Sequence, residues 1–532
     1  MKKAWKILGV ALGFIGIFAA MPDADAKRKN NEPEKILYIP HDNRPVVYDQ
    51  TLEIIQKAGY QVVMPPKEIM GGRDDLGNPD RLWEWLARNT KKDIKAAVIS
   101  SDAMLYGSLV SSRKHNYGKQ IILERAELFR EFHKKHKKLP LYVFGSVMRT
   151  PRNGVASGYE EPDYYRNYGA NIFRYTALID KLELEGLTPR ENKEIVFLQK
   201  LIPERAMDDW MERREKNFEA NEKLVDMADE KIFNCLLLGR DDNAPFSQTH
   251  IEGRNLAKYG ENISKNKYQT IAGIDEVGLM LLTRAINDRT NNKPSIFVSY
   301  NLGTGGETVP SYSDETIDTS INAEFMAVGA NRVYDTARAD FILAVNTNID
   351  GATYEAPNAN NTTTPRQSTT NFVNTVQNYL DEGNKVAVAD IAFANGSDNA
   401  LMEQFKNRKM LFKLQAYAGW NTATNSSGFA LSTGILTKKM SAEDKNQLLF
   451  TRYLDDWAYQ ANIRNTVAAR LDWIEGDGYY NLLDDKKYDA ADWCEQMYTS
   501  FIRNNLPEVK VKNQFSVEFP WNRMFENRIV FK

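Results

Sequence analysis

Acidic, amide and arginine side chains follow several short apolar runs, and these residue types suit acid and base chemistry best. The most concentrated tract, 239–245, places Arg240, Asp241, Asp242 and Asn243 after the apolar run 236–238. Two carboxyl groups divide the work of an acid and a base when unlike surroundings separate their pKa values. Because neighbouring residues of an extended chain point to opposite sides, we expect at most one aspartate to face a ligand. A turn closed by an Asx hydrogen bond is the alternative.

Two further tracts have similar chemistry. Asp42 and Arg44 follow the run 36–39, and Ser101 and Asp102 follow the run 97–99. Together with Arg149, which comes after the run 141–144, Arg44 would bind a carboxylate or phosphate through two hydrogen bonds. The alternative for Asp42 and Arg44 is an ion pair that only holds their loop.

Asp275 and Glu276 follow the run 271–273 and precede a helical pattern. One of them, or Asp102, would be the second carboxylate of a hydrolase pair with Asp241 or Asp242, and the separation of the pair would then decide the stereochemistry of hydrolysis. The alternative is that Asp275 caps the helix and Glu276 is a favourable charge in its first turn.

The tract 418–422 contains an aromatic ring beside an amide. Trp420 would stack on the face of a sugar, and Asn421 would bind its hydroxyl groups. The alternative for Trp420 is packing at a contact between domains, since large aromatic side chains are well suited to burial.

The elements that must position these residues alternate between strand and helix. Helical patterns separate most of the strand-like runs, and this alternation predicts a parallel α/β fold. Ligands of such folds bind beyond the carboxyl ends of the strands. The runs are 35–39, 61–64, 96–99, 141–144, 234–238, 270–273, 295–299, 341–345, 386–389 and 413–417.

Ten strands exceed an eight-stranded barrel, so the sequence predicts two α/β domains, with a decorated α/β barrel as the alternative. We place the first domain at 27–290, with a helical insertion at about 159–231, and the second at 291–440. A helical C-terminal region, 441–532, ends in a short strand pair.

The first 26 residues resemble a secretory signal peptide. Lys2, Lys3 and Lys6 precede an apolar stretch at 7–20, and Ala24-Asp25-Ala26 forms a small-residue cleavage site. The stretch is shorter than the roughly 18 residues that a membrane span needs. We therefore expect a secreted or periplasmic, envelope-located protein without membrane insertion after cleavage.

Composition and charge limit the partners and metal ions that we expect this protein to bind. The chain has 532 residues, a formal charge of −2, 42% hydrophobic and 26% charged residues, which is typical of soluble globular proteins. Near-neutral charge argues against nucleic acid as a partner. Five histidines without a metal-binding spacing argue against zinc. We predict no cofactor, with calcium or magnesium on aspartate oxygens as the alternative, and no disulfide between Cys235 and Cys494.

Five of these tracts, 42–45, 101–107, 239–245, 273–278 and 418–422, are similar to those of a bacterial family catalogued as domain of unknown function 4127 (DUF4127). The similarity extends over nearly the whole mature chain. The resemblance implies no assigned activity, so it transfers no catalytic role to any residue.

The leading hypothesis is an exported hydrolase acting on a carbohydrate or cell-envelope glycan. Two alternatives stay open: a non-catalytic binder of an envelope sugar or anionic metabolite, and a metal-dependent amide or ester hydrolase. The predicted acids and bases are Asp241 or Asp242 with Asp275, Glu276 or Asp102, and the predicted substrate-binding residues are Asp42, Arg44, Arg149, Arg240, Asn243, Trp420 and Asn421.

Overall fold

The computed structural model describes residues 32–154, 159–475, 480–482, 485–509 and 515–531. The predicted signal peptide lies outside the described residues. The elements described below all belong to one compact unit, Glu34–Lys532.

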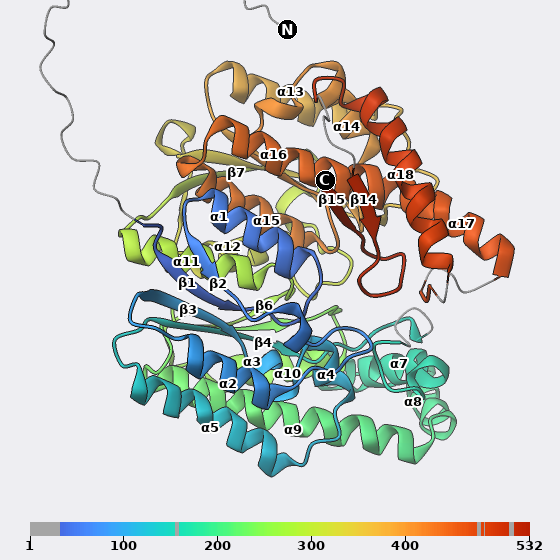
Figure 1. Cartoon of the computed structure of the whole chain (residues 1–532). Coiled ribbons are helices and arrows are strands. Elements are labelled where there is room, and N and C mark those ends of the chain that lie inside the picture. Colours follow the sequence, from blue (N-terminus) through green and yellow to red (C-terminus); the bar gives the residue numbers. More distant parts are fainter. Residues whose placement is uncertain (1–31, 155–158, 476–479, 483–484, 510–514, 532) are drawn as a thin grey trace, which may run out of the picture. The chain divides into compact units, whose positions relative to one another are not determined.

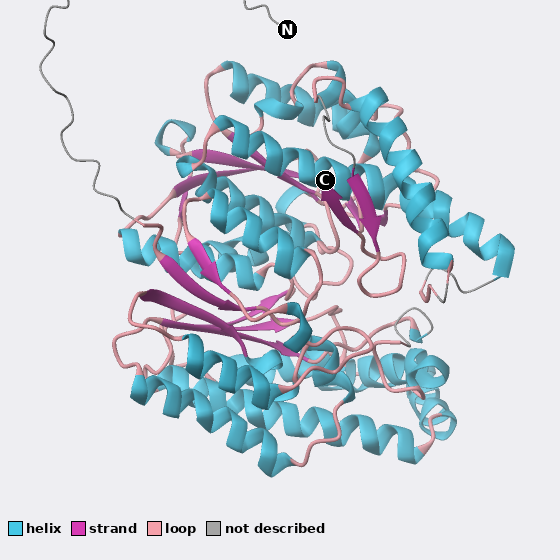
Figure 2. Cartoon of the chain, in the orientation of Figure 1, coloured by secondary structure: helices cyan, strands magenta, loops and turns pink. Residues whose placement is uncertain are grey.

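A six-stranded parallel sheet, sheet A, forms from the first half of the chain (Figures 1 and 2). Its central strands are buried on both faces, which explains their continuous apolar runs. In β1, for example, Ile36 and Tyr38 enter one apolar cluster while Leu37 and Ile39 enter another. In spatial order the strands are β2 (Gln61–Val63), β1 (Lys35–Ile39), β3 (Ile94–Ser100), β4 (Leu141–Val147), β5 (Cys235–Arg240) and β6 (Tyr268–Ala272).

A second parallel sheet, sheet B, has five strands. Taken in chain order, both sheets follow the doubly wound order 2-1-3-4-5, which sheet A extends by a sixth strand. Both sheets are open, so the prediction of two parallel α/β sheets is confirmed and the barrel alternative is wrong. In spatial order the strands of sheet B are β13 (Ala416–Ala418), β11 (Val386–Asp390), β9 (Phe341–Asn346), β7 (Ser295–Tyr300) and β8 (Asn331–Val333).

The remaining strands of the described residues form two small two-stranded sheets. One is a parallel pair, β10 (Tyr354–Glu355) with β12 (Phe393–Ala394). The other is an antiparallel pair, β14 (Phe515–Glu518) with β15 (Arg528–Phe531). The helices of the first half are η1 (Val46–Gln50), α1 (Thr51–Lys57), α2 (Pro79–Asn89), α3 (Ser101–Tyr106), α4 (Leu109–Lys114), α5 (Lys119–Lys135), α7 (Tyr165–Leu184), α8 (Pro189–Leu201), α9 (Glu204–Asp229), α10 (Gln248–Tyr259) and α11 (Val277–Thr290). Those of the second half are α12 (Ile317–Val328), α13 (Gln367–Asp381), α14 (Asn399–Asn407), α15 (Ala423–Leu436), α16 (Ala442–Arg452), η7 (Tyr453–Ile463), α17 (Arg464–Glu475) and α18 (Lys486–Asn505). Short 3₁₀ turns lie at Lys67–Ile69, Gly305–Glu307, Thr336–Arg338, Leu411–Lys413 and Thr437–Lys439.

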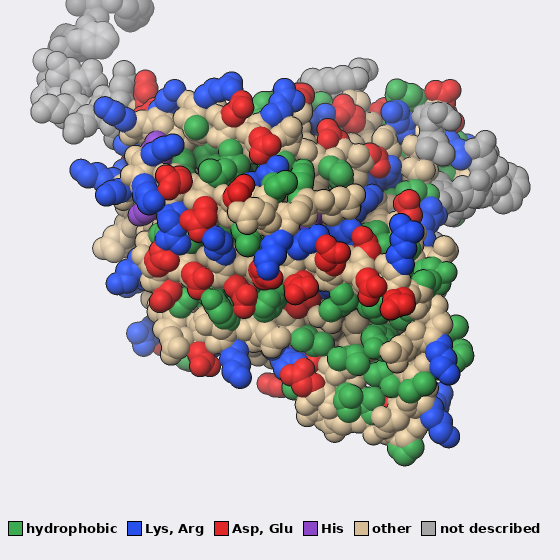
Figure 3. Space-filling model, turned by 90° about the horizontal axis from the view of Figure 1, so that it is seen from below, with side chains coloured by type: hydrophobic (Ala, Val, Ile, Leu, Met, Phe, Trp, Pro, Cys, Tyr) green, Lys and Arg blue, Asp and Glu red, His purple; other side chains and the backbone are tan. Residues whose placement is uncertain are grey.

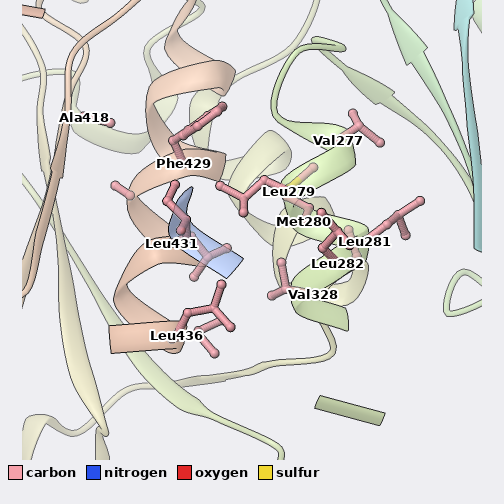
Figure 4. Packing of buried hydrophobic residues seen from close by; sticks show 14 of the residues in the cluster. Val277, Leu279, Met280, Leu281, Leu282, Val328, Ala418, Phe429, Leu431 and Leu436 are labelled. Carbon is pink, nitrogen blue, oxygen red and sulfur yellow. The ribbon is translucent and has the colours of Figure 1, made fainter. Parts of the chain in front are cut away.

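A layer of helices lies between the two sheets. Figure 1 shows α1, α11, α12 and α15 between the strands of sheet A and those of sheet B. One apolar cluster joins these helices to both sheets, and Figure 4 shows side chains of α11 packed beside those of α15. Helices α2, α5 and α9 cover the other face of sheet A, and α13, α14, η7 and α18 cover the other face of sheet B.

Helix α15 is buried along its whole length, and small residues let its neighbours approach it. A Cβ atom at Gly434 would lie 2.9 Å from the ring of Phe341, and one at Gly428 would lie 2.7 Å from Cγ of Glu276. Glycine is therefore required where α15 meets β9 and the start of α11.

The surface and the cysteines agree with a globular protein. Figure 3 shows basic and acidic side chains interspersed over one face of the molecule. Cys235 and Cys494 are both buried and free, so the prediction of no disulfide is confirmed. Among the helices that the structure describes, none has the length and apolar character needed to span a bilayer.

Candidate active site

The candidate site lies at the carboxyl ends of sheet A. Strand β1 has β2 on one side and β3 on the other, so the direction of winding reverses beside it. Open α/β sheets bind ligands at such a reversal, because the adjoining loops diverge and leave a crevice. The tract 41–44 begins two residues after the end of β1, and Ser101 and Asp102 follow β3 directly.

Arg44 is the centre of a first group of ionic contacts. Its Nε donates to Oδ2 of Asp42 at 2.9 Å, and its Nη1 and Nη2 donate to Asp275 at 3.1 and 2.6 Å. Nε2 of His41 lies 3.1 Å from Oδ1 of Asp275, and Asn421, which follows β13 of sheet B, donates to Oδ2 of Asp275 at 2.9 Å. This group therefore joins loops of both sheets.

The surroundings of Asp275 keep it ionised. Burial raises the pKa of Asp275, but the charge of Arg44 and the contact with His41 outweigh burial and hold the pKa well below its usual range. Asp275 is thus a fixed negative charge. The N-cap alternative is wrong, because Glu276 and not Asp275 occupies the N-cap position of α11, and no side chain of the described residues caps that helix.

Three more arginines form a second group around Glu160. Nη1 of Arg113 donates to Oε2 of Glu160 at 2.9 Å, Nη2 of Arg149 donates to the same atom at 3.3 Å, and Arg523 donates to Oε1. Burial alone would raise the pKa of Glu160, yet Arg523, Arg149 and Arg113 hold it well below its usual range. Glu161 accepts from Nε of Arg149 at 2.8 Å.

The two aspartates after β5 are held by different arginines of this second group. Asp241 accepts from Nη2 of Arg113 at 2.5 Å, and Asp242 accepts from Nη1 of Arg149 at 2.9 Å. The side chain of Asp241 is 9% exposed, whereas that of Asp242 is 27% exposed. Of the two, Asp242 is the one that a ligand can reach.

Asp242 has an unusual backbone and a raised pKa. Its φ of 38° lies in the left-handed region, where strained residues often have a functional role. Burial and then the charge of Asp241 raise the pKa of Asp242 to about 6, although Arg149 opposes them. A carboxyl group of this kind can release and take up a proton near neutral pH.

Asp102 lies close to both groups and is also buried. It is 2% exposed and accepts from the backbone N–H of Ser146 at 2.9 Å and from Oγ of Ser146 at 3.0 Å. Burial raises the pKa of Asp102 to about 6, and the charges of His41 and Asp241 also act on it. Its hydrogen bonds tie the end of β3 to β4.

Arg240 and Asn243 contact the loop that precedes α12. Arg240 donates to Asp314 at 2.8 Å and to Glu315 at 2.7 Å, and Nδ2 of Asn243 donates to Asp314 at 2.6 Å. These contacts brace the end of β5 against the second half of the chain.

Glu276 and Trp420 are both buried. Glu276 is 0% exposed against α15, and burial raises its pKa to about 8, although the hydroxyl of Thr424 lies near enough to lower it. Trp420 is 3% exposed and its ring lies 6.4 Å from that of Phe525. The position of Trp420 fits the packing alternative.

Several residues of the site escaped the sequence reasoning. His41 stands two residues after the end of β1, beside Asp42 and Arg44, and this position was the signal that could have indicated it. Arg113 lies on α4, Glu160 follows a stretch outside the described residues, and Arg523 comes from the loop between β14 and β15. None of these three follows a strand of sheet A, so the strand-end pattern could not indicate them.

No three histidine, cysteine, aspartate or glutamate side chains of the described ranges are arranged to hold a metal ion.

Comparisons with known proteins identify the family of the chain but no individual relative. A family model described as "Protein of unknown function (DUF4127)" matches residues 36–530. No curated protein and no solved structure matches the chain.

Proposed function

Because the chain belongs to the DUF4127 family, whose description assigns no reaction, we propose its function from the site itself. The protein is an exported hydrolase of a carbohydrate or cell-envelope glycan, and Asp242 is its proton donor. Asp241, bound by Arg113, is the second carboxylate of the pair.

The observation that carries this proposal is the state of Asp242. A general acid needs a pKa near the working pH and access to the leaving group. Asp242 has a pKa of about 6 and is the more exposed of the two aspartates at the end of β5. Glycoside hydrolysis uses such a pair, in which one carboxyl group is protonated and the other is ionised.

The charge balance favours a neutral, hydroxyl-rich substrate. Each of the four arginines of the two groups already binds at least one carboxylate; these are Arg44, Arg113, Arg149 and Arg523. The cluster therefore has little unpaired positive charge with which to attract a phosphate or carboxylate. A sugar can bind through its hydroxyl groups without displacing these ion pairs.

A second candidate is a binder of an envelope sugar without catalysis. The low exposure of Asp241 favours the non-catalytic binder, because a second carboxylate that takes part in hydrolysis must reach the substrate or a water molecule.

The two candidates are separated by turnover. We would incubate the purified protein with peptidoglycan fragments and oligosaccharides and follow the addition of water by mass spectrometry. Asp242→Asn should abolish turnover and leave ligand binding in calorimetry, while Asp229→Asn, at the exposed end of α9, should change neither. Sugar binding without turnover in the unaltered protein would support the binder, and full turnover in Asp242→Asn would exclude Asp242 as the acid.

A further inference from the structure

Helix α8 presents apolar side chains to solvent instead of to the core. Val196, Phe197 and Leu201 are 51%, 60% and 42% exposed, whereas Leu198 is the buried residue of the helix. At 100° per residue, the three exposed side chains fall on one face. This is the reverse of the usual arrangement, in which the apolar face of a helix packs inward.

The exposed face of α8 is also positively charged. Arg190, Lys193 and Lys200 lie on the same face as the apolar side chains and are all exposed. Both glutamates of the helix are less exposed and bind cations of α7: Glu191 contacts Lys181 and Glu194 contacts Arg174, each at 2.7 Å. No acidic side chain of α8 is exposed to balance the three cations.

Apolar surface is concentrated in this part of the chain. Helix α7 packs against α8, and Leu182 and Leu184 at its end are 50% and 47% exposed. With the three residues of α8, they make five of the sixteen exposed large hydrophobic side chains of the described residues, all within 182–201. Scattered exposed hydrophobic residues need no explanation, but a concentration of this kind marks an interaction site.

We propose that the α7–α8 hairpin docks reversibly onto an anionic phospholipid surface. The apolar side chains of α8 enter the boundary between headgroups and acyl chains, and the three cations bind lipid phosphates. No described helix spans a membrane, so docking is peripheral. This proposal is independent of the hydrolase proposal.

Charge also argues against a second copy of the chain as the occupant. A symmetric dimer places the same patch of both subunits together. Arg190, Lys193 and Lys200 would then face the same cations of the copy, which costs free energy. An anionic surface removes this repulsion and makes use of the same charges.

The experiment is co-sedimentation of residues 34–532, the compact unit, with phospholipid vesicles. We expect binding to vesicles of phosphatidylglycerol and phosphatidylcholine, weak binding to phosphatidylcholine alone, and loss of binding at high salt. Lys193→Gln with Lys200→Gln should weaken binding about thirtyfold, because each cation near an anionic surface strengthens binding by a factor of about five. Val196→Ser with Phe197→Ser should weaken it about tenfold or more.

A matched control lies on α5, where Ile121→Ser with Lys135→Gln changes the same kinds of exposed side chain and should leave binding unchanged. Equal binding to both kinds of vesicle, or unchanged binding in the α8 variants, would overturn the proposal. Light scattering after gel filtration adds a further test: a dimer that Phe197→Ser converts to monomer would assign the face to a second copy and also overturn it.

Discussion

The two parallel sheets share a strand order, but the polar residues at their carboxyl ends are arranged differently. At sheet A, arginines and carboxylates form two groups of ionic contacts, and Asp242 remains 27% exposed. At sheet B, Asp390 and Asp398 are both 0% exposed, and Asn346 is 1% exposed. The polar cluster of sheet A is therefore partly accessible to solvent, whereas that of sheet B is closed.

The cluster of sheet B has its partners within itself. Asp390 accepts from Nδ2 of Asn346 at 2.9 Å and from the backbone N–H of Asp398 and the hydroxyl of Tyr417, each at 2.8 Å. Burial and then the charge of Asp398 raise the pKa of Asp390 to about 7. Asp398 also caps α14 and binds Arg366.

A position at a strand end is therefore not enough to make a site. The strand-end rule describes both sheets equally well. What separates them is that sheet A leaves a carboxyl group accessible, whereas sheet B uses its carboxyl groups to connect loops and a helix. Substitutions at the carboxyl end of sheet A should therefore change kcat, whereas those at the carboxyl end of sheet B should change the free energy of unfolding.

The largest effect should come from Asp242→Asn. The amide cannot donate the proton that the leaving group needs, so kcat should fall by about 100-fold or more. Because Asp242 is partly exposed, the free energy of unfolding in urea should change little. If turnover falls only in proportion to the amount of folded protein, Asp242 has a structural role, and the contrast between the two sheets is wrong.

Asp398→Ala should instead destabilise the protein. The change removes the N-cap of α14, one of the two hydrogen bonds that Nδ2 of Asn346 donates, and the ion pair of Arg366, which together cost about 3 kcal/mol. Urea unfolding measures this loss, and kcat per folded molecule should stay the same. A fall in kcat with unchanged stability would place chemistry at sheet B.

Glu276→Gln tests the layer between the sheets. The folded pKa of about 8 lies above the ordinary value of 4.5, so the contribution of Glu276 to stability is fully present below about pH 4.5 and is lost as the pH rises through about 8. The slope is at most about 1.4 kcal/mol per pH unit. The glutamine variant should flatten the dependence of unfolding free energy on pH between these limits, and an unchanged slope would contradict the burial argument.

Arg149→Gln should move the pH profile of kcat. As an acid, Asp242 must be protonated, so kcat should fall as the pH rises through about 6. Arg149 lowers the pKa of Asp242, and its removal should shift the fall in kcat to higher pH. Arg149→Lys keeps the charge and should restore most of the original profile. A shift to lower pH would argue against Asp242 as the acid.

Trp420→Phe should have the smallest effect. The ring is buried, so the variant should lose about 1 kcal/mol of stability through packing while KM stays unchanged. An increase in KM without destabilisation would show that the ring contacts substrate.

The sequence predicted most strands because parallel strands buried on both faces are continuous apolar runs. The exceptions are informative. The run 413–417 is divided between a 3₁₀ turn that ends at Lys413 and the short β13, and the three residues of β8 were missed. Strand β8 has only one apolar residue, Val333, and so forms no apolar run, whereas the equally short β2 was predicted from Val62 and Val63. The shared strand order depends on spatial neighbours that the sequence does not contain.

The site was predictable only in part. The tracts of Asp42, Asp241 and Asp275 could be found because each follows a strand, and Arg44 does bind Asp42. Arg113, Glu160 and Arg523 reach the site from distant parts of the chain, and their contacts with the acids depend on tertiary folding. The raised pKa of Asp242 also depends on burial, which the sequence around it does not indicate.

The apolar cluster between the sheets has a consequence for synthesis of the protein. Side chains of β1, β3 and β4 share that cluster with α15, which begins almost three hundred residues after the end of β4. While the ribosome is still making the second half, α1 and α11 can cover that face of the first sheet, but the side of α11 that packs against α15 has no cover and is open to proteases and aggregation. We therefore expect a nascent chain that stops before Ala423 to need a chaperone, because the burial of α11 is complete only after α15 has emerged.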